Sequence, residues 1–322
     1  METTSYVEWI RARVGSRKIF LVFSSVILLD EQGRVLLQRR TDFDVWGLPG
    51  GVMEIEEDIV TCARREVQEE TGLTVGELAL VGVYTHPQFD VTYPNGDQVQ
   101  QFTVCLRGVV NGGHMQVDGV ETREQAFFSW PPPADLTIPL WYRAMLRDGL
   151  GDGLPAFTPP FVNGRSQDQI ATVRPYIGND RFIAVGASVV IVREDGRILM
   201  VQRSDNGSWL FPAGYSDLGE NVAYTAVRET QEETGLDIVP ERILGIYSSP
   251  VFHHTYPNGH QVKNVGVTFR ARLLGGDARA DEDEIAAVAW MTPEEVLHFS
   301  PAQYRTYFES CLAHLQDGYF LL

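Results

Sequence analysis

Glutamates gather at two places in the chain, with the same spacing each time. On a helix that turns about 100° per residue, this spacing places three carboxylates on one narrow face. Like charges so close destabilise a helix by a few tenths of a kcal/mol per pair, and a divalent cation between them reverses that effect. Carboxylate oxygens suit Mg²⁺ or Mn²⁺, so the pattern predicts a metal site; the alternative is a solvated acidic face. The residues are Glu66, Glu69 and Glu70 in the first place and Glu229, Glu232 and Glu233 in the second.

Both groups of glutamates belong to a longer sequence that the chain contains twice. A shift of 163 residues lays residues 68–73 on the identical residues 231–236. Later in the chain we expect a three-residue deletion, after which Glu124 matches Glu284 at a shift of 160. A repeat of this length indicates one domain written twice.

The repeat divides the chain into two domains and a linker. Residues 149–165 are rich in Gly and Pro and have no apolar periodicity, so we expect a linker there. The first domain is then 1–148 and the second 166–322. Two such copies could pack against each other as a pseudo-dimer within one chain.

Each copy has the pattern of alternating strands and helices. An amphipathic helix is followed by a hairpin, a loop, a longer helix, further strands and a final helix. In the longer helix the stripe of Ile59, Ala63 and Val67 lies opposite the glutamates and can pack on a sheet, and Gly72 ends the helix. Strands interleaved with helices predict an α/β fold whose sheet is covered on both faces.

The glutamates and their flanking residues resemble a complete Nudix box. In the first copy the motif reads Gly51-x5-Glu57-x7-Arg65-Glu66-Val67-x-Glu69-Glu70-x-Gly72-Leu73. In the second it reads Gly214-x5-Glu220-x7-Arg228-Glu229-Thr230-x-Glu232-Glu233-x-Gly235-Leu236, where Thr230 takes the place of an aliphatic residue. The resemblance to single-domain bacterial Nudix hydrolases covers nearly the whole of each repeat.

The resemblance implies a tandem pair of α/β/α sandwiches, each with a mixed sheet, and Mg²⁺-dependent hydrolysis of a nucleoside diphosphate linked to another group. Glu66 and Glu70 would bind the metal, with Glu69 as a third or partial ligand, and Glu229, Glu233 and Glu232 match them. The backbone carbonyl of Gly50 would also face a metal, as would that of its counterpart Ala213. Arg65 and Arg228 would orient the carboxylates, and Glu57 and Glu220 would lie at the other edge of the site.

Several residues could serve as the general base or bind a phosphate. Acidic residues before two tryptophans are candidates for the base, namely Glu121 and Glu124 in the first copy and Asp281, Glu282 and Glu284 in the second. Arg40 and Arg203 end a strand in each copy and could bind a phosphate; the alternative is an exposed strand end.

The substrate is narrowed only to a small nucleotide. Pro87 and Pro250 follow the box at nearly the distance found in ADP-ribose-hydrolysing members of the family, which favours ADP-ribose or an NDP-sugar-like compound. The alternatives are a pyrophosphatase that removes damaged nucleoside triphosphates, and a nucleotide-binding sensor with one or both sites inactive.

Composition excludes several other classes. A net charge of −17 repels the backbone of a long nucleic acid. Eighteen apolar residues never run together, so we expect no membrane span. Three scattered cysteines fit no disulfide framework, and the polar first residues do not resemble a secretion signal; we therefore expect a cytoplasmic protein.

Overall fold

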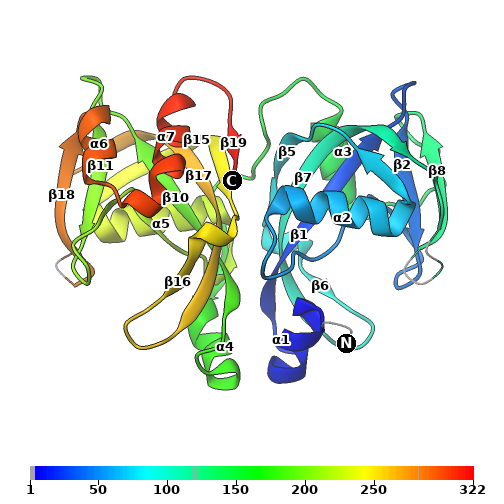
Figure 1. Cartoon of the computed structure of the whole chain (residues 1–322), viewed down its shortest axis with the longest axis horizontal. Helices are drawn as coiled ribbons and strands as arrows, with labels where there is room; N and C mark the ends of the chain where they lie inside the picture. The colour runs from blue at the N-terminus through cyan, green and yellow to red at the C-terminus, as the bar shows by residue number, and fades with distance from the viewer. Residues whose placement is uncertain (1–3, 118, 120–121, 282) are drawn as a thin grey trace. The chain divides into compact units, whose positions relative to one another are not determined.

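The computed structural model describes residues 4–117, 119, 122–281 and 283–322. They form two compact units, Met1–Ala156 and Phe157–Leu322 (Figure 1). The division falls inside the segment 149–165 that we expected as a linker. Ala156 pairs with Gly82 of the first unit, and residues 162–167 form a strand of the second, so parts of that segment pack onto the units they adjoin.

The first unit is built around a mixed sheet. Strand β1 runs parallel to β7 and antiparallel to β2, and β2 also pairs with β3 and β8. The short strands β4, β5 and β6 pair with β7. Its elements are α1 (Tyr6–Val14), β1 (Ile19–Leu29), β2 (Val35–Arg40), β3 (Trp46–Gly47), α2 (Ile59–Thr71), β4 (Leu73–Val75), β5 (Ala79–Tyr84), η1 (Pro87–Phe89), β6 (Val91–Thr92), β7 (Gln98–Gly113), β8 (Thr122–Phe128) and α3 (Leu140–Gly149).

Helices α2 and α3 cover opposite faces of this sheet. Ser24 of β1 contacts Cys62 of α2, whereas Ile27, which has the opposite parity in the strand, packs with α3. The stripe Ile59, Ala63 and Val67 is fully buried, as its spacing predicts. The expected α/β/α layers are thus confirmed.

The second unit repeats this plan with local changes. Strand β10 is parallel to β17, as β1 is to β7, but β11 pairs with β12 and β18 in a separate sheet. Its elements are β9 (Val162–Gln167), α4 (Gln169–Ile177), β10 (Phe182–Ile191), β11 (Ile198–Arg203), β12 (Trp209–Leu210), β13 (Ala213–Tyr215), β14 (Leu218–Glu220), α5 (Val222–Thr234), β15 (Leu236–Tyr247), η2 (Pro250–Phe252), β16 (His253–Thr255), β17 (Gln261–Gly276), β18 (Ile285–Met291), α6 (Pro293–Phe299), η3 (Ala302–Tyr304), α7 (Arg305–Ala313) and β19 (Phe320–Leu321).

Strand register corrects the expected match between Glu124 and Glu284. Arg39 lies opposite Glu124, and its counterpart Gln202 lies opposite Ala287. The shift of 163 therefore continues through the last strand, and the proposed deletion is wrong. By register, Glu284 corresponds to Glu121, which lies outside the described residues.

The helices that carry the glutamates begin and end where local chemistry dictates. Asp58 caps α2 by accepting hydrogen bonds from two backbone N–H groups, and Gly72 ends the helix in the left-handed conformation with φ 67°. In α5, Asn221 caps the helix by accepting from the backbone N–H of Tyr224, and Gly235 ends it in the left-handed conformation. Among the described residues, every helix is too short or too polar to cross a membrane.

Candidate functional site

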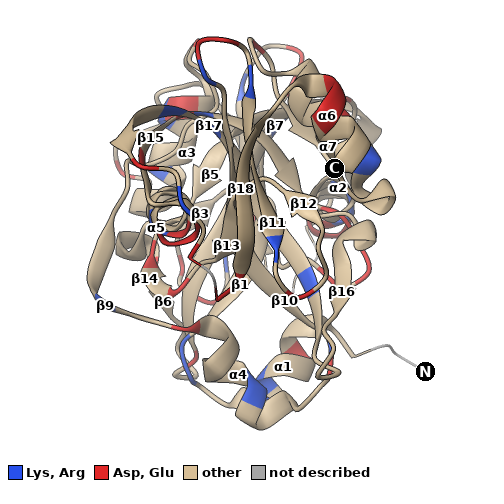
Figure 2. Cartoon of the chain, turned by 90° about the vertical axis from the view of Figure 1, so that its left-hand side faces the viewer, with Lys and Arg blue, Asp and Glu red and all other residues tan. Residues whose placement is uncertain are grey.

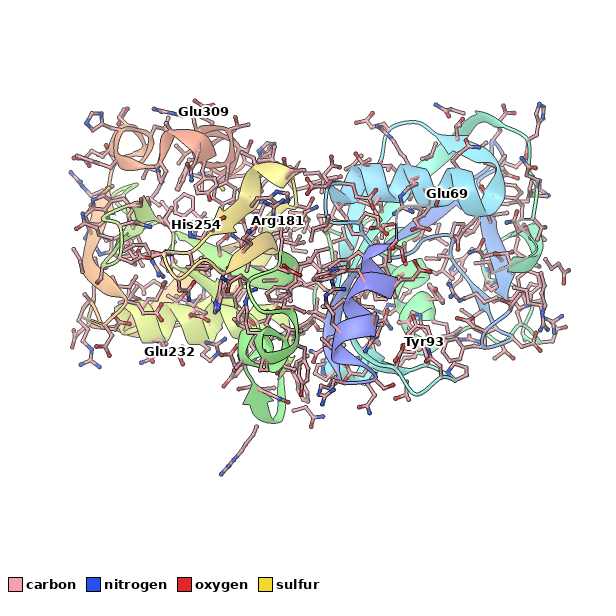
Figure 3. The ribbon with its side chains drawn as sticks, turned by 60° about the horizontal axis from the view of Figure 1, so that its bottom comes forward. Glu69, Tyr93, Arg181, Glu232, His254 and Glu309 are labelled. Carbon is pink, nitrogen blue, oxygen red and sulfur yellow. The ribbon has the colours of Figure 1, made fainter. Side chains whose placement is uncertain are left out.

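Helix α2 places its three glutamates at different depths. The side chain of Glu66 is 12% exposed and that of Glu69 is 59% exposed, whereas Glu70 is buried. Helix α5 repeats this order in Glu229, Glu232 and Glu233. The two exposed members, Glu69 and Glu232, are labelled in Figure 3, and Figure 2 marks acidic residues in red. The three glutamates expected on one narrow face therefore lie at increasing depth, from an exposed side chain to a buried one.

An arginine on each helix gathers the neighbouring carboxylates. In α2, Nη2 of Arg65 lies 2.6 Å from Oε1 of Glu57, and its Nη1 lies 2.7 Å from Glu66 and 3.0 Å from Glu69. Arg228 of α5 makes the same set of bonds, to Glu220, Glu229 and Glu232. Hydrogen bonding to Glu57 raises the pKa of Arg65. These contacts agree with the expectation that the arginines orient the carboxylates.

The buried glutamate of each helix accepts a backbone hydrogen bond from the glycine-rich loop. Oε2 of Glu70 accepts from Gly50 N–H and from Gln38 Nε2, both at 2.8 Å, while its other oxygen is buried without a hydrogen-bond partner among the described residues. Oε2 of Glu233 accepts from Ala213 N–H at 3.0 Å. Burial raises the pKa of both glutamates to about 8, and it raises the pKa of Glu229 to about 7.

The two loop positions differ in how strictly they require glycine. A Cβ on Gly51 would lie 2.5 Å from the carboxylate of Glu66, and one on Gly214 would lie 1.9 Å from that of Glu229. At the preceding position Gly50 has φ 145°, whereas Ala213 lies in a regular strand opposite Ser188. The alanine therefore changes the backbone but keeps the N–H that bonds the glutamate. That the carbonyls of Gly50 and Ala213 face a metal stays a prediction.

A pocket opens beside each set of glutamates. The pocket of the first unit has a volume of about 520 Å³ and includes Arg40, Gly50 and Glu66 in its lining. The pocket of the second unit has a volume of about 530 Å³ and includes Arg203 and Glu229. Both arginines thus reach the pockets, held by neighbouring aspartates: Arg40 lies 2.8 Å from Asp42, and Arg203 lies 3.3 Å from Asp205.

Of the three described candidates for the general base, Glu124, Asp281 and Glu284, only Glu284 lines a pocket. Glu284 lines the second pocket, 3.3 Å from Arg203. Glu124 lies opposite Arg39, on the strand face that points away from Gln38 and Gln125, and is not part of the first pocket's lining. The neighbouring candidates Glu121 and Glu282 lie outside the described residues.

Two glutamines that the sequence reasoning missed surround Glu70. Nε2 of Gln38 donates to its carboxylate, and Nε2 of Gln125 donates to its backbone carbonyl at 2.6 Å. Both are buried, Gln38 in β2 and Gln125 in β8. A polar side chain at an inward strand position needs a partner, and this was the signal available in the sequence.

The chemistry of the donors fits a divalent cation, although they are not arranged as a preformed cluster. Within the described part of the chain, no group of three His, Cys, Asp or Glu side chains is gathered as a metal site. The unpaired oxygen of Glu70 is nevertheless a hard donor without a partner, and Glu66 is close enough to raise its pKa further. A cation at this point would satisfy an oxygen that the fold leaves unpaired.

Known proteins share this domain. The NUDIX domain family matches residues 21–149 and 183–310. A MutT-like protein of Streptomyces ambofaciens is 36% identical over 131 residues, which are 41% of this chain and 74% of that protein. An ADP-ribose pyrophosphatase of Methanocaldococcus jannaschii is 35% identical over 96 residues, 29% of this chain and 53% of that protein.

Among solved structures, an ADP-ribose pyrophosphatase from Streptococcus suis matches 43% of this chain and 96% of its own, at 25% identity and a TM-score of 0.35. The domain matches cover well over half of the chain, one in each unit. The chain therefore belongs to the NUDIX family of hydrolases that act on pyrophosphate bonds, and it carries the family's domain twice.

Proposed function

We propose that the protein is a Mg²⁺-dependent hydrolase that cleaves the pyrophosphate linkage of a nucleoside diphosphate joined to another group, such as ADP-ribose or an NDP-sugar. The observation that carries this proposal is the pairing, in each pocket, of a guanidinium with two glutamates of the neighbouring helix. Arg40 and Glu66 line the first pocket, and Arg203 and Glu229 line the second. Such a pocket can hold a phosphate chain at one side and a cation at the other.

In the first site Glu66 and Glu70 would hold the cation, with Glu69 as a partial ligand and the carbonyl of Gly50 completing the set. In the second site Glu229 and Glu233 would do so, with Glu232 and the carbonyl of Ala213. Bound Mg²⁺ neutralises phosphate oxygens and lowers the pKa of an attacking water.

The chain's own residues supply orientation and charge. Arg65 and Arg228 hold the outer carboxylates in place, and Arg40 and Arg203 would bind a phosphate. In the second site Glu284, beside Arg203, is the residue proposed as general base. The position of Glu124 gives no support to the same role in the first site.

Formation of nucleoside monophosphate from a panel of nucleotides, followed by anion-exchange chromatography, tests the proposal. ADP-ribose, NDP-sugars and nucleoside triphosphates are each incubated with the chain and Mg²⁺, and with EDTA in parallel. We expect turnover of a linked diphosphate that stops in EDTA. Turnover of triphosphates alone would replace the substrate class, and tight binding without turnover of any nucleotide would make the protein a sensor instead.

A further inference from the structure

The second pocket carries an aromatic ring on a different strand from the first. Phe23 of β1 forms a bridge with Val52, and the corresponding pair in the second unit is Gly186 and Tyr215. A Cβ on Gly186 would lie 2.3 Å from the carbonyl oxygen of Gly214, so a phenylalanine does not fit there. The exchange adds a hydroxyl that the first pocket lacks at this point.

This hydroxyl connects two other side chains of the pocket. Tyr215 donates to Oδ1 of Asn264 at 2.7 Å, and its oxygen lies 2.9 Å from the hydroxyl of Tyr256. A phenol has one proton, and Tyr215 gives it to Asn264, so Tyr256 must donate to Tyr215. In these two hydrogen bonds Tyr256 thus donates to Tyr215, and Tyr215 donates to Asn264.

The bond from Tyr215 occupies the oxygen of the Asn264 amide. With Oδ1 occupied, the amide nitrogen carries two N–H donors. No described residue accepts a hydrogen bond from that nitrogen, and Asn264 lines the pocket. The second pocket thus presents an oriented, neutral donor to a ligand.

The first pocket has an amide at the matching position, but the protein uses its oxygen and one of its two N–H groups internally. Nε2 of Gln101 donates to the carbonyl of Phe89 at 2.6 Å, and Oε1 accepts from the hydroxyl of Thr103 at 3.1 Å. The counterpart of Thr103 is Gly266, where a Cβ would lie 2.2 Å from the hydroxyl of Tyr247. The two pockets therefore differ in which amide is available.

One part of the second pocket suits a planar, uncharged group. Aromatic side chains of Tyr247, Phe252 and Tyr304 are part of its lining. His254, labelled in Figure 3, packs edge-on against Tyr256 with ring centroids 4.5 Å apart, and burial lowers its pKa. Rings beside a neutral donor are the surroundings in which a heteroaromatic base can stack and accept a hydrogen bond.

We propose that Asn264, held by Tyr215 and Tyr256, is a specificity-determining residue of the second pocket that donates to an acceptor on the base of the bound nucleotide. In the first pocket the corresponding Gln101 is held instead by Phe89 and Thr103, so the two pockets select different nucleotides. This inference rests on the proposed function only for the presence of a nucleoside diphosphate moiety.

Calorimetry on the full chain with Mg²⁺ tests this without relying on hydrolysis. The probes are the α,β-methylene analogues of ADP and UDP, and methylenediphosphonate, which has no base. We expect Asn264→Leu to weaken the binding of at least one nucleotide analogue roughly threefold to tenfold and to leave the binding of methylenediphosphonate unchanged. Tyr215→Phe, which keeps the ring but frees the amide to rotate, should weaken the same analogue to a smaller extent. Gln101→Leu makes the matched change in the first pocket and should not weaken the binding of that analogue.

Three results would overturn the inference: unchanged nucleotide affinity in Asn264→Leu, equal weakening of methylenediphosphonate, or no binding of either analogue to the wild-type chain. In a hydrolysis assay the same variant should raise KM and preserve kcat for any substrate that the wild type cleaves. A wild-type chain that binds the analogues but cleaves nothing would refute the proposed function and leave this test intact.

Discussion

Glu70 and Glu233 hold the same position in the two units but have different neighbours. Each accepts a backbone N–H from the residue before the second loop glycine, from Gly50 in one case and Ala213 in the other. Only Glu70 also accepts from a side chain, that of Gln38, whose counterpart in the second unit is Val201. Burial raises the pKa of both to about 8. The repeat therefore keeps the contacts that place the carboxylate and lets the residues behind it change.

The largest effect expected from this comparison is the loss of both buried carboxylates. Glu70→Gln together with Glu233→Gln removes the charge that would hold the cation in each site, so turnover should fall by about a thousandfold. Either change alone should leave partial activity. The activity left in each single variant measures the contribution of the other, unchanged unit. The measurement is the rate of nucleoside monophosphate formation at saturating substrate.

Glu77→Gln, a change at an exposed glutamate of the first unit, is the control and should leave activity unchanged. If the double variant keeps full activity, the assignment of the site is wrong. If one single variant is as inactive as the double variant, only that unit is an active enzyme.

The helix and its row of glutamates could be predicted from the sequence because they depend on local rules. The spacing of Ile59, Ala63 and Val67 predicted the buried stripe, and Gly72 predicted the helix end. The sequence could not supply the partners of Glu70. Gln38 and Gln125 come from two strands that meet only when the sheet forms, and nothing local to either residue points to the helix.

The match of Glu124 with Glu284 failed for a related reason. Acidic residues are common in loops, so an acid before a tryptophan can be aligned at more than one shift. Backbone pairing decides the register, because a strand moved out of register would place its inward side chains on the wrong face. Here Leu37 lies opposite Ala126 and Met200 lies opposite Ala289, at the unchanged shift of 163.

The second prediction concerns the loop glycine that touches the outer carboxylate. Gly51→Ala and Gly214→Ala each place a methyl group where the carboxylate of Glu66 or Glu229 now lies. Moving a side chain that acts in the reaction by about an ångström lowers the rate by up to about a hundredfold. We therefore expect each variant to lose roughly tenfold to a hundredfold in rate. The closer approach in the second unit predicts the larger loss there.

Steady-state kinetics against Mg²⁺ concentration provide the measurement. Gly275→Ala is the matched control, because a Cβ at that position meets nothing within 4 Å. Equal and small losses at Gly51, Gly214 and Gly275 would show that the carboxylates move aside without consequence.

The third prediction is a pH dependence of stability in the absence of metal. Because burial raises the pKa of Glu70 and Glu233 from the ordinary 4.5 to about 8, the folded state binds protons that the unfolded state has released. The free energy of unfolding should therefore fall as the pH rises from about 4.5 to 8, by an amount on the order of a few kcal/mol. Urea unfolding in EDTA measures it.

Added Mg²⁺ should restore stability at the upper end of this range, because it binds the ionised carboxylates. The double Gln variant should lose most of the pH dependence. A stability that rises between pH 5 and pH 8 in EDTA would contradict the sign of the two pKa shifts.

The smallest effect is expected from exchanging the side chains that lie next to the two buried glutamates. Gln38→Val removes a hydrogen bond that favours the ionised form of Glu70, so its pKa should rise further and Mg²⁺ should bind the first site a few-fold to tenfold more weakly at neutral pH. Val201→Gln offers the same bond to Glu233 and should lower its pKa. Calorimetric titration with Mg²⁺ at several pH values resolves both changes. If Gln38→Val leaves the Mg²⁺ affinity at its wild-type value at every pH, the difference between the units lies outside the metal site, and Gln38 serves only to fill the strand.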